Sequence, residues 1–212
     1  MDATTHVPSG LSQQQHRSSG RAARPPGGQH QHAFSLFDLL VTLVVASTLT
    51  ALAVPAFKQL TVRNRITTQV NRLLTDLHLA RSEAIKRREH VVLCKSRDGR
   101  HCTEDAAWHD GWVVFVDPND NHRVEPDETV MRVQGTQAGV ETHLNASGGA
   151  QRNHYLGYRP DGMSGKRGTF TFCDSTAPSL ARAIIVYWTG RARVSDKTDE
   201  GHALTCPADT DG

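Results

Sequence analysis

Two arginines close to the C-terminus have the residue type and spacing to bind phosphate. Arg191 and Arg193 follow Gly190 in the segment from Trp188 to Val194. Side chains two residues apart point to the same face of a strand, and the planar guanidinium group matches the oxygens of a phosphate. Gly190 lets the backbone approach a partner closely, because it has no side chain. The alternative interpretation is a solvated strand edge whose charges prevent aggregation.

A second pair of cations, Lys166 and Arg167, lies in a glycine-rich segment that reads as a loop. We expect these two residues to extend the same basic patch. The loop is not a phosphate-binding P-loop, because its G-x-x-G-K spacing is shorter than that motif requires.

The segment 117–128 is rich in oxygen ligands of the kind that Ca²⁺ prefers. It lacks the spacing and the central glycine of an EF-hand, and turns built by Asx hydrogen bonds explain the same residues. We therefore predict no metal site, and the sequence gives no indication of a cofactor. The 12 histidines are scattered, no catalytic constellation stands out, and we predict that the protein is not an enzyme.

Four cysteines, Cys94, Cys102, Cys173 and Cys206, fit disulfide formation better than zinc binding. A zinc site needs closer pairs, and an even number in an exported chain is typical of disulfides. Three connectivities are possible. We predict that Cys94 pairs with Cys102 across a turn-rich segment and that Cys173 pairs with Cys206, which would tie the polar tail to a strand.

One carboxylate, Asp38, lies near the start of an otherwise uncharged apolar run from residue 33 to residue 57. Such a run is long enough to cross a bilayer, which needs about 20 apolar residues. A charge at mid-membrane costs roughly 2.5–3.5 kcal/mol on insertion scales. Asp38 must therefore lie near a membrane edge or pair with a cation.

The charge balance gives no general indication of a nucleic-acid partner. The 212 residues carry 24 basic and 22 acidic side chains, and the segment before Phe34 holds the whole excess. The rest of the chain has 21 of each, so any site for nucleic acid must be a local patch.

The elements that position these residues begin with a polar leader, residues 1–33, which has too few apolar residues to form a core. A long helix follows and is expected to end near Arg88, with Pro55 kinking or locally melting it. Residues 34–57 form its apolar half and residues 58–90 its amphipathic half. Helical spacing in the second half predicts one buried face: Ile66, Val70, Leu73, Leu74, Leu77, Ala80 and Ala84.

Residues 91–212 read as a β-rich globular domain. Five runs rich in Val, Ile, Phe and Thr predict strands at residues 90–95, 112–117, 129–134, 169–174 and 182–188. The fold class is therefore α+β, with a long N-terminal helix packed on an antiparallel β-sheet domain. Trp108, Trp112 and Trp188 are predicted to lie in the core or on a sheet face.

Taken together, these features resemble the GspH/FimT family of type IV minor pilins and type II secretion pseudopilins. The resemblance rests on the leader, on Phe-Ser-Leu-Phe-Asp before the apolar helix, and on the segments LARSEAIKR, VVLC, DGWVVFVD, GTFTFCD and TGRARV. It covers residues 33 to about 195 and implies a type IV pilin-like fold.

The resemblance implies how the N-terminus is processed. Prepilin peptidase would cut between Ala33 and Phe34, and the new amino terminus of Phe34 would be methylated. Asp38, where the family usually has Glu, would pair with the amino terminus of a neighbouring subunit in the filament. The alternative is an ordinary secretory signal cleaved after Ala53, but the apolar run is longer than a signal peptide needs.

The resemblance also implies a single-pass inner-membrane protein with a periplasmic domain, found at a filament surface or tip after assembly. Its partners would be other pilins or pseudopilins, with double-stranded DNA as a further partner. A late G-R-x-R motif binds DNA in FimT-like pilins, and Gly190, Arg191 and Arg193 match it, with Lys166 and Arg167 adding to the patch. We expect a pilus minor pilin that binds DNA for natural transformation. The alternative is a type II secretion pseudopilin that binds no DNA.

Overall fold

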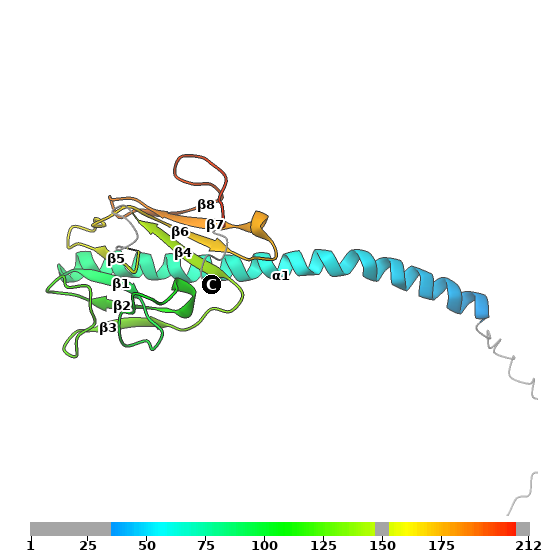
Figure 1. Ribbon diagram of the computed structural model, residues 1–212, viewed down its shortest axis with the longest axis horizontal. Helices are drawn as coiled ribbons and strands as arrows, with labels where there is room; N and C mark the ends of the chain where they lie inside the picture. Colours follow the sequence, from blue (N-terminus) through cyan, green and yellow to red (C-terminus); the bar gives the residue numbers. More distant parts are fainter. Residues whose placement is uncertain (1–34, 147–152, 207–212) are drawn as a thin grey trace, which may run out of the picture. The chain divides into compact units, whose positions relative to one another are not determined.

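The computed structural model describes residues 35–146 and 153–206. The leader, Ala33 and Phe34 lie outside these residues. Contacts divide the chain into two units, residues 1–45 and 46–212. The β-strands lie in the second unit, and Figure 1 shows where they lie along the chain.

Helix α1 (Leu36–Arg87) is continuous through Pro55. Of the two outcomes expected at Pro55, a kink or local melting, local melting therefore does not occur. Proline removes one backbone hydrogen bond, and the Leu-, Val- and Ala-rich turns on both sides keep the helix formed. After Arg87 the helix ends with Arg88 in the left-handed conformation, at φ 59°.

The second half of α1 buries one face. Ile66, Val70, Leu73, Leu77, Ala80 and Ala84 are buried, as predicted, and Leu74 is partly buried. Two polar residues, Gln69 and Asp76, are buried on the same face, and neither was among the residues predicted to be buried. Both form hydrogen bonds that compensate for their burial: Gln69 donates to Gln137, and Trp112 donates to Asp76.

Two four-stranded antiparallel sheets follow the helix. The first sheet has the order β3-β2-β1-β5, formed by β1 (Val91–Lys95), β2 (Trp112–Val116), β3 (Val130–Gln134) and β5 (Tyr155–Tyr158). The second has the order β4-β6-β7-β8, formed by β4 (Glu141–Ala146), β6 (Gly168–Cys173), β7 (Arg182–Val186) and β8 (Ala192–Ser195). The described connections contain the short 3₁₀ helices η1 (Trp108–Asp110) and η3 (Pro178–Leu180).

The main core lies where the buried face of α1 meets both sheets (Figure 1). Leu93 and Val114 come from the first sheet, and Phe170, Phe172 and Ile184 come from the second. The opposite face of the first sheet has a smaller core of Val92, Cys94, Val113 and Phe115. The α+β fold class is confirmed, and the β domain consists of two sheets.

Candidate functional site

The β7–β8 turn, residues 187–191, carries the glycine and the first arginine of the predicted phosphate site. The N–H of Gly190 donates to the carbonyl of Tyr187 at 2.8 Å, and the N–H of Tyr187 donates to the carbonyl of Arg191 at 3.0 Å. Gly190 has φ +77°, in the left-handed region that favours glycine. The sequence therefore forms a tight turn at this point.

This turn is held against α1 and against the loop that contains Gly162. Arg81 of α1 donates from Nε to the carbonyl of Gly162 at 3.0 Å and from Nη2 to the carbonyl of Thr189 at 3.1 Å. A Cβ at Gly190 would collide with the Gly162 carbonyl oxygen. In the structure, the close approach that Gly190 permits is thus to another segment of the chain. Sequence analysis did not identify Arg81, because its role depends on contacts 81 and 108 residues away.

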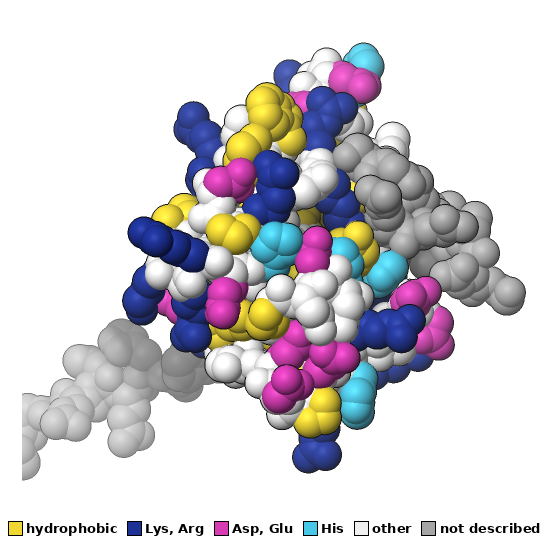
Figure 2. Space-filling model, turned by 90° about the vertical axis from the view of Figure 1, so that its left-hand side faces the viewer, with side chains coloured by type: hydrophobic (Ala, Val, Ile, Leu, Met, Phe, Trp, Pro, Cys, Tyr) yellow, Lys and Arg dark blue, Asp and Glu magenta, His cyan; other side chains and the backbone are white. Residues whose placement is uncertain are grey.

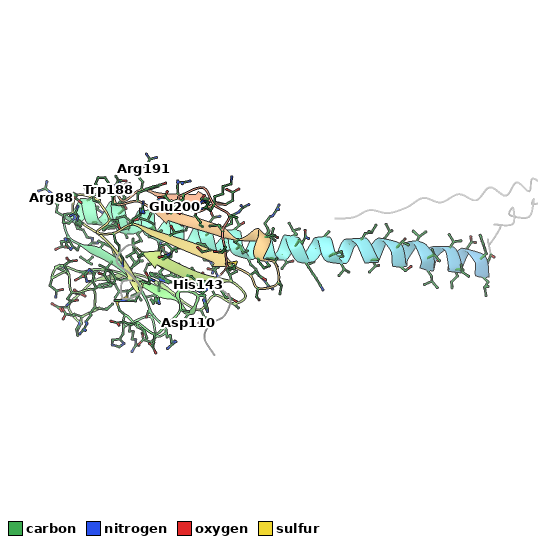
Figure 3. All side chains as sticks on the ribbon, turned by 45° about the horizontal axis from the view of Figure 1, so that its top comes forward. Arg88, Asp110, His143, Trp188, Arg191 and Glu200 are labelled. Carbon is green, nitrogen blue, oxygen red and sulfur yellow. A yellow bond between two sulfur atoms is a disulfide. The ribbon has the colours of Figure 1, made fainter. Side chains whose placement is uncertain are left out.

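Two large side chains of the turn face solvent. Trp188 is 60% exposed, and Arg191 is exposed. Within the described ranges, the side chain of Arg191 forms no hydrogen bond or ion pair. Figure 3 shows Trp188, Arg191 and Arg88 toward the same end of the β domain. The expectation that Trp188 lies in the core or on a sheet face is wrong, because the residue belongs to a turn, whereas Trp108 and Trp112 are buried as predicted.

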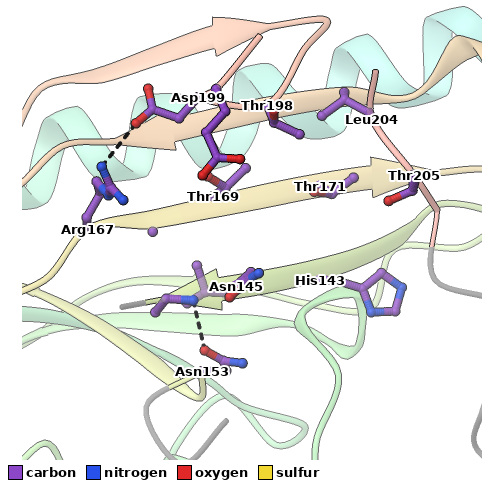
Figure 4. A pocket seen from close by; sticks show the side chains of 14 residues that line it. His143, Asn145, Asn153, Arg167, Thr169, Thr171, Thr198, Asp199, Leu204 and Thr205 are labelled. Carbon is purple, nitrogen blue, oxygen red and sulfur yellow. Dashed lines mark hydrogen bonds and ion pairs between the residues drawn. The ribbon is translucent and has the colours of Figure 1, made fainter. Parts of the chain in front are cut away.

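Arg193 and Arg167 come together around a single carboxylate, Asp199. Arg193 Nε donates to the Tyr187 phenol oxygen at 2.9 Å, and Arg193 Nη2 lies 3.7 Å from Asp199 Oδ1. Arg167 Nη1 lies 3.3 Å from Asp199 Oδ2 (Figure 4). The hydrogen bond to Tyr187 raises the pKa of Arg193 above its ordinary value. Two guanidinium groups on one carboxylate keep a net positive charge, and both arginine side chains remain about half exposed.

Lys166 does not add a surface charge to this patch, contrary to the prediction. It is only 6% exposed, and its Nζ lies 3.7 Å from the centre of the Tyr155 ring. Lys166 and Arg167 are adjacent in the chain, and one packs on Tyr155 of β5 while the other reaches Asp199. Alternating side-chain direction along extended backbone explains this separation.

Both disulfides form with the predicted pairing. Cys94 is bonded to Cys102, and Cys173 is bonded to Cys206. The second bond ties the tail that carries Asp199 back to β6. It therefore helps to position the acceptor that holds Arg167 and Arg193.

A polar groove lies over the outer face of the second sheet, between β4 and the tail (Figure 4). Hydroxyl and amide side chains dominate its lining, among them Asn145, Thr169, Thr171 and Thr205. The Arg167–Asp199 ion pair closes one end. Because most of these groups are uncharged, the groove adds little charge to the basic patch.

Helix α1 is the one helix in the described part of the chain that is long and apolar enough to cross a membrane, with a mean hydropathy of 2.1 in its most apolar window. Asp38 is exposed in its first turn. An acidic residue there has a favourable interaction with the helix dipole.

A long apolar helix that continues into an antiparallel β domain defines a pilin-like subunit. The family model described as "Type II transport protein GspH" matches residues 69–190. The pilin-like protein PilA1 of Thermus thermophilus is 31% identical over 169 residues, which cover 77% of this chain and 98% of that protein. The chain therefore belongs to the GspH family, as a minor pilin or pseudopilin of a type IV filament or a type II secretion system.

Two solved structures of pilin-like proteins also match part of this chain. The type IV minor pilin FimU of Pseudomonas aeruginosa has a TM-score of 0.49 and 16% identity, and the match covers 63% of this chain and 90% of FimU. The minor pseudopilin EpsH of Vibrio cholerae has a TM-score of 0.44 and 14% identity, with 62% and 96% covered.

Proposed function

We propose that this chain is a minor pilin of a type IV pilus that binds double-stranded DNA for uptake. The observation that carries the proposal is the exposed guanidinium of Arg191 on the β7–β8 turn. Its charge is available to a phosphate, because no side chain of the described residues already binds it.

The rigidity of the turn supports the same proposal. Arg81 holds the turn through Thr189 and Gly162, and the Gly190 contact fixes the backbone next to Arg191. A ligand that binds a preformed turn loses less conformational entropy on binding. Arg193 and Arg167 are half-exposed and supply a second cationic point close to β8.

The expected mode of binding is contact with the DNA backbone. Arginines at a surface turn reach phosphates, which position a protein without reading the base sequence. The exposed indole of Trp188 adds an apolar surface next to the cations. With so few cations, we expect an affinity in the range of non-specific complexes, with dissociation constants of about 10⁻⁴–10⁻⁶ M at physiological salt.

The second candidate is a pseudopilin of the type II secretion system, with no role in DNA binding. The description of the matching family model favours it. In that case, the exposed turn would contact protein partners, and removing Arg191 would alter secretion.

We further propose that prepilin peptidase removes residues 1–33, that Phe34 becomes the methylated N-terminus, and that Asp38 pairs with a neighbouring subunit's amino terminus. Residues 34–57 would then form the inner-membrane and filament-core segment, residues 58–90 its amphipathic continuation, and residues 91–212 the periplasmic domain. N-terminal analysis of the membrane fraction tests the cut, and a start after Ala53 would contradict it. Asp38→Ala should insert into the membrane and fail to enter filaments.

The proposed function is tested in a transformable host that carries the gene. The double variant Arg191→Ala/Arg193→Ala should lower the transformation frequency while filaments still assemble. Arg123→Ala, which removes one exposed arginine from the loop after β2, serves as the control for the loss of a surface charge elsewhere. Normal transformation combined with defective protein secretion in the double variant would support the pseudopilin instead.

A further inference from the structure

Two histidines and two aspartates gather where β1 begins and β2 ends. His90 immediately precedes β1, and Asp117 immediately follows β2. The antiparallel pairing of these strands brings the two residues side by side, and the N–H of Asp117 donates to the carbonyl of His90 at 2.8 Å. The loop after β2 then folds back and brings Asp120 and His122 close to His90 and Asp117.

The side chains of this group converge on one another. His90 Nδ1 lies 2.7 Å from Asp120 Oδ1, and His122 Nε2 lies 3.3 Å from the same oxygen. One ligand atom each from Asp117, Asp120 and His122 lie within 4.8 Å of one another. Among the residues that the structure describes, this is the one group of three or more His, Cys, Asp or Glu side chains with such spacing.

Asp117 is the buried member of the group, and backbone N–H groups of the loop hold its carboxylate in place. Asp117 is fully buried, and its two carboxylate oxygens accept the N–H groups of Asn121 at 3.1 Å and His122 at 2.9 Å. Each carboxylate oxygen has a second lone pair. A buried carboxylate that faces a second carboxylate is costly unless a cation lies between them.

We propose that Asp117, Asp120, His122 and His90 bind a divalent transition metal, with Zn²⁺ as the best match. Zinc takes imidazole nitrogens and carboxylate oxygens at about 2.0–2.2 Å in a tetrahedral arrangement. Neighbouring ligand atoms then lie about 3.4 Å apart, which the observed spacing permits after small side-chain rotations. The two positive charges balance the two carboxylates. Ca²⁺ is a poorer match, since it prefers oxygen ligands alone.

The surroundings hold the imidazoles and leave an entry path. The ring of Tyr155 packs on His122, with centroids 3.9 Å apart, and Lys166 lies on Tyr155. Asp120 is half-exposed, and His90 and His122 are each about one-quarter exposed. Figure 2 shows histidine and acidic side chains gathered on the end of the molecule that faces the viewer. A metal ion can therefore reach the site from solvent.

The test is thermal unfolding of the full chain in detergent micelles with and without ZnCl₂. At a hundredfold excess over the dissociation constant, the unfolding midpoint should rise by about 5–10 °C for a domain of this size. Asp120→Asn/His122→Ala should abolish the rise. The matched control is Asp98→Asn/His101→Ala. It removes an exposed ion pair outside the proposed site, in which His101 Nδ1 lies 2.6 Å from Asp98 Oδ2. This control variant should still show the rise in unfolding midpoint.

Imidazole is a common zinc ligand, so all three proteins carry alanine at His6, His16, His30 and His32, which keeps the leader from contributing to the signal. A second measurement needs no further variant: X-ray absorption of this background protein, loaded with one equivalent of Zn²⁺, should show two imidazole ligands. No rise in midpoint, an equal rise in both double variants, or a zinc spectrum without imidazole would each overturn the proposal.

Discussion

The indole N–H of Trp112 donates a 2.8 Å hydrogen bond to the carboxylate of Asp76, and both residues are buried. Arg132 Nε lies 3.4 Å from the other carboxylate oxygen. Burial raises the pKa of Asp76, and the hydrogen bond from Trp112 and the charge of Arg132 oppose this effect. One polar residue of α1 thereby links the helix to β2 and β3.

Replacing Asp76 by alanine should destabilise the fold. The buried N–H of Trp112 would lose its acceptor, and an unsatisfied buried donor costs about 1–3 kcal/mol. Asp76→Asn keeps an oxygen that accepts this hydrogen bond and should cost less. Denaturant unfolding followed by tryptophan fluorescence gives both values. Equal stability of Asp76→Ala and the parent chain would contradict the role of this hydrogen bond.

Asp76 should also give the fold a pH dependence of defined sign. Burial holds its folded-state pKa above the ordinary value of an aspartate, so the folded state binds this proton more readily than the unfolded chain. The resulting stabilisation is present below that value and is lost as pH rises through the raised pKa. The stability of the parent chain relative to Asp76→Asn should therefore fall over the pH range that begins near 4, about the ordinary pKa of an aspartate, and extends upward through the raised pKa. Unfolding midpoints of both proteins across this range would show it, and a difference that grows with pH would contradict it.

Gly190→Ala should destabilise the β7–β8 turn more than Gly201→Ala destabilises the tail. Both glycines have positive φ, at 77° and 85°, so alanine at either pays a backbone cost of about 1–2 kcal/mol. A Cβ at Gly201 meets nothing within 4 Å, whereas one at Gly190 collides with the Gly162 carbonyl. The difference between the two unfolding free energies measures this close approach. Equal losses of unfolding free energy in the two variants would show that the β7–β8 turn moves away from the Gly162 carbonyl without an energetic cost.

The spacing and type of the apolar residues predicted the helix and most of the strands. Helical spacing from Ile66 to Ala84 identified the buried face of α1, and the Val- and Phe-rich runs identified five of the eight strands. Three strands of the described residues were missed. One is the four-residue strand β8, with the sequence ARVS. The other two are β4, with the sequence ETHLNA, and β5, with YLGY, which lack a β-branched run. Tertiary pairing with β6 and β1 forms these strands.

The candidate sites were less predictable, because they depend on long-range contacts. The sequence pointed to Arg191 and Arg193, but it could not show that Asp199 would hold Arg193. The loop after β2 was recognised as oxygen-rich, and the prediction of no metal weighed that loop and the scattered histidines separately. His90 lies next to this loop only because β1 pairs with β2, and no short-range sequence pattern predicts that pairing.

Removing the Cys173–Cys206 bond with Cys173→Ser/Cys206→Ser should cost about 3–4 kcal/mol in the chain-entropy model, given the separation of 33 residues. The tail should also fray, which would release Asp199 from Arg167 and Arg193. Unfolding experiments give the first effect, and limited proteolysis of the tail gives the second. A tail as resistant to protease as that of the parent chain would show that its other contacts suffice.

Binding of duplex DNA by the full chain in detergent micelles tests the central claim most directly. Fluorescence anisotropy over a salt series should show sequence-independent binding that weakens with salt, with a slope of about −0.9 per phosphate neutralised. Arg191→Ala/Arg193→Ala should remove most of the binding and make the slope shallower by about two phosphate contacts, while Arg123→Ala loses much less. If the double variant binds as tightly as the parent chain, with an unchanged slope, the assignment of DNA binding to the β7–β8 turn is wrong.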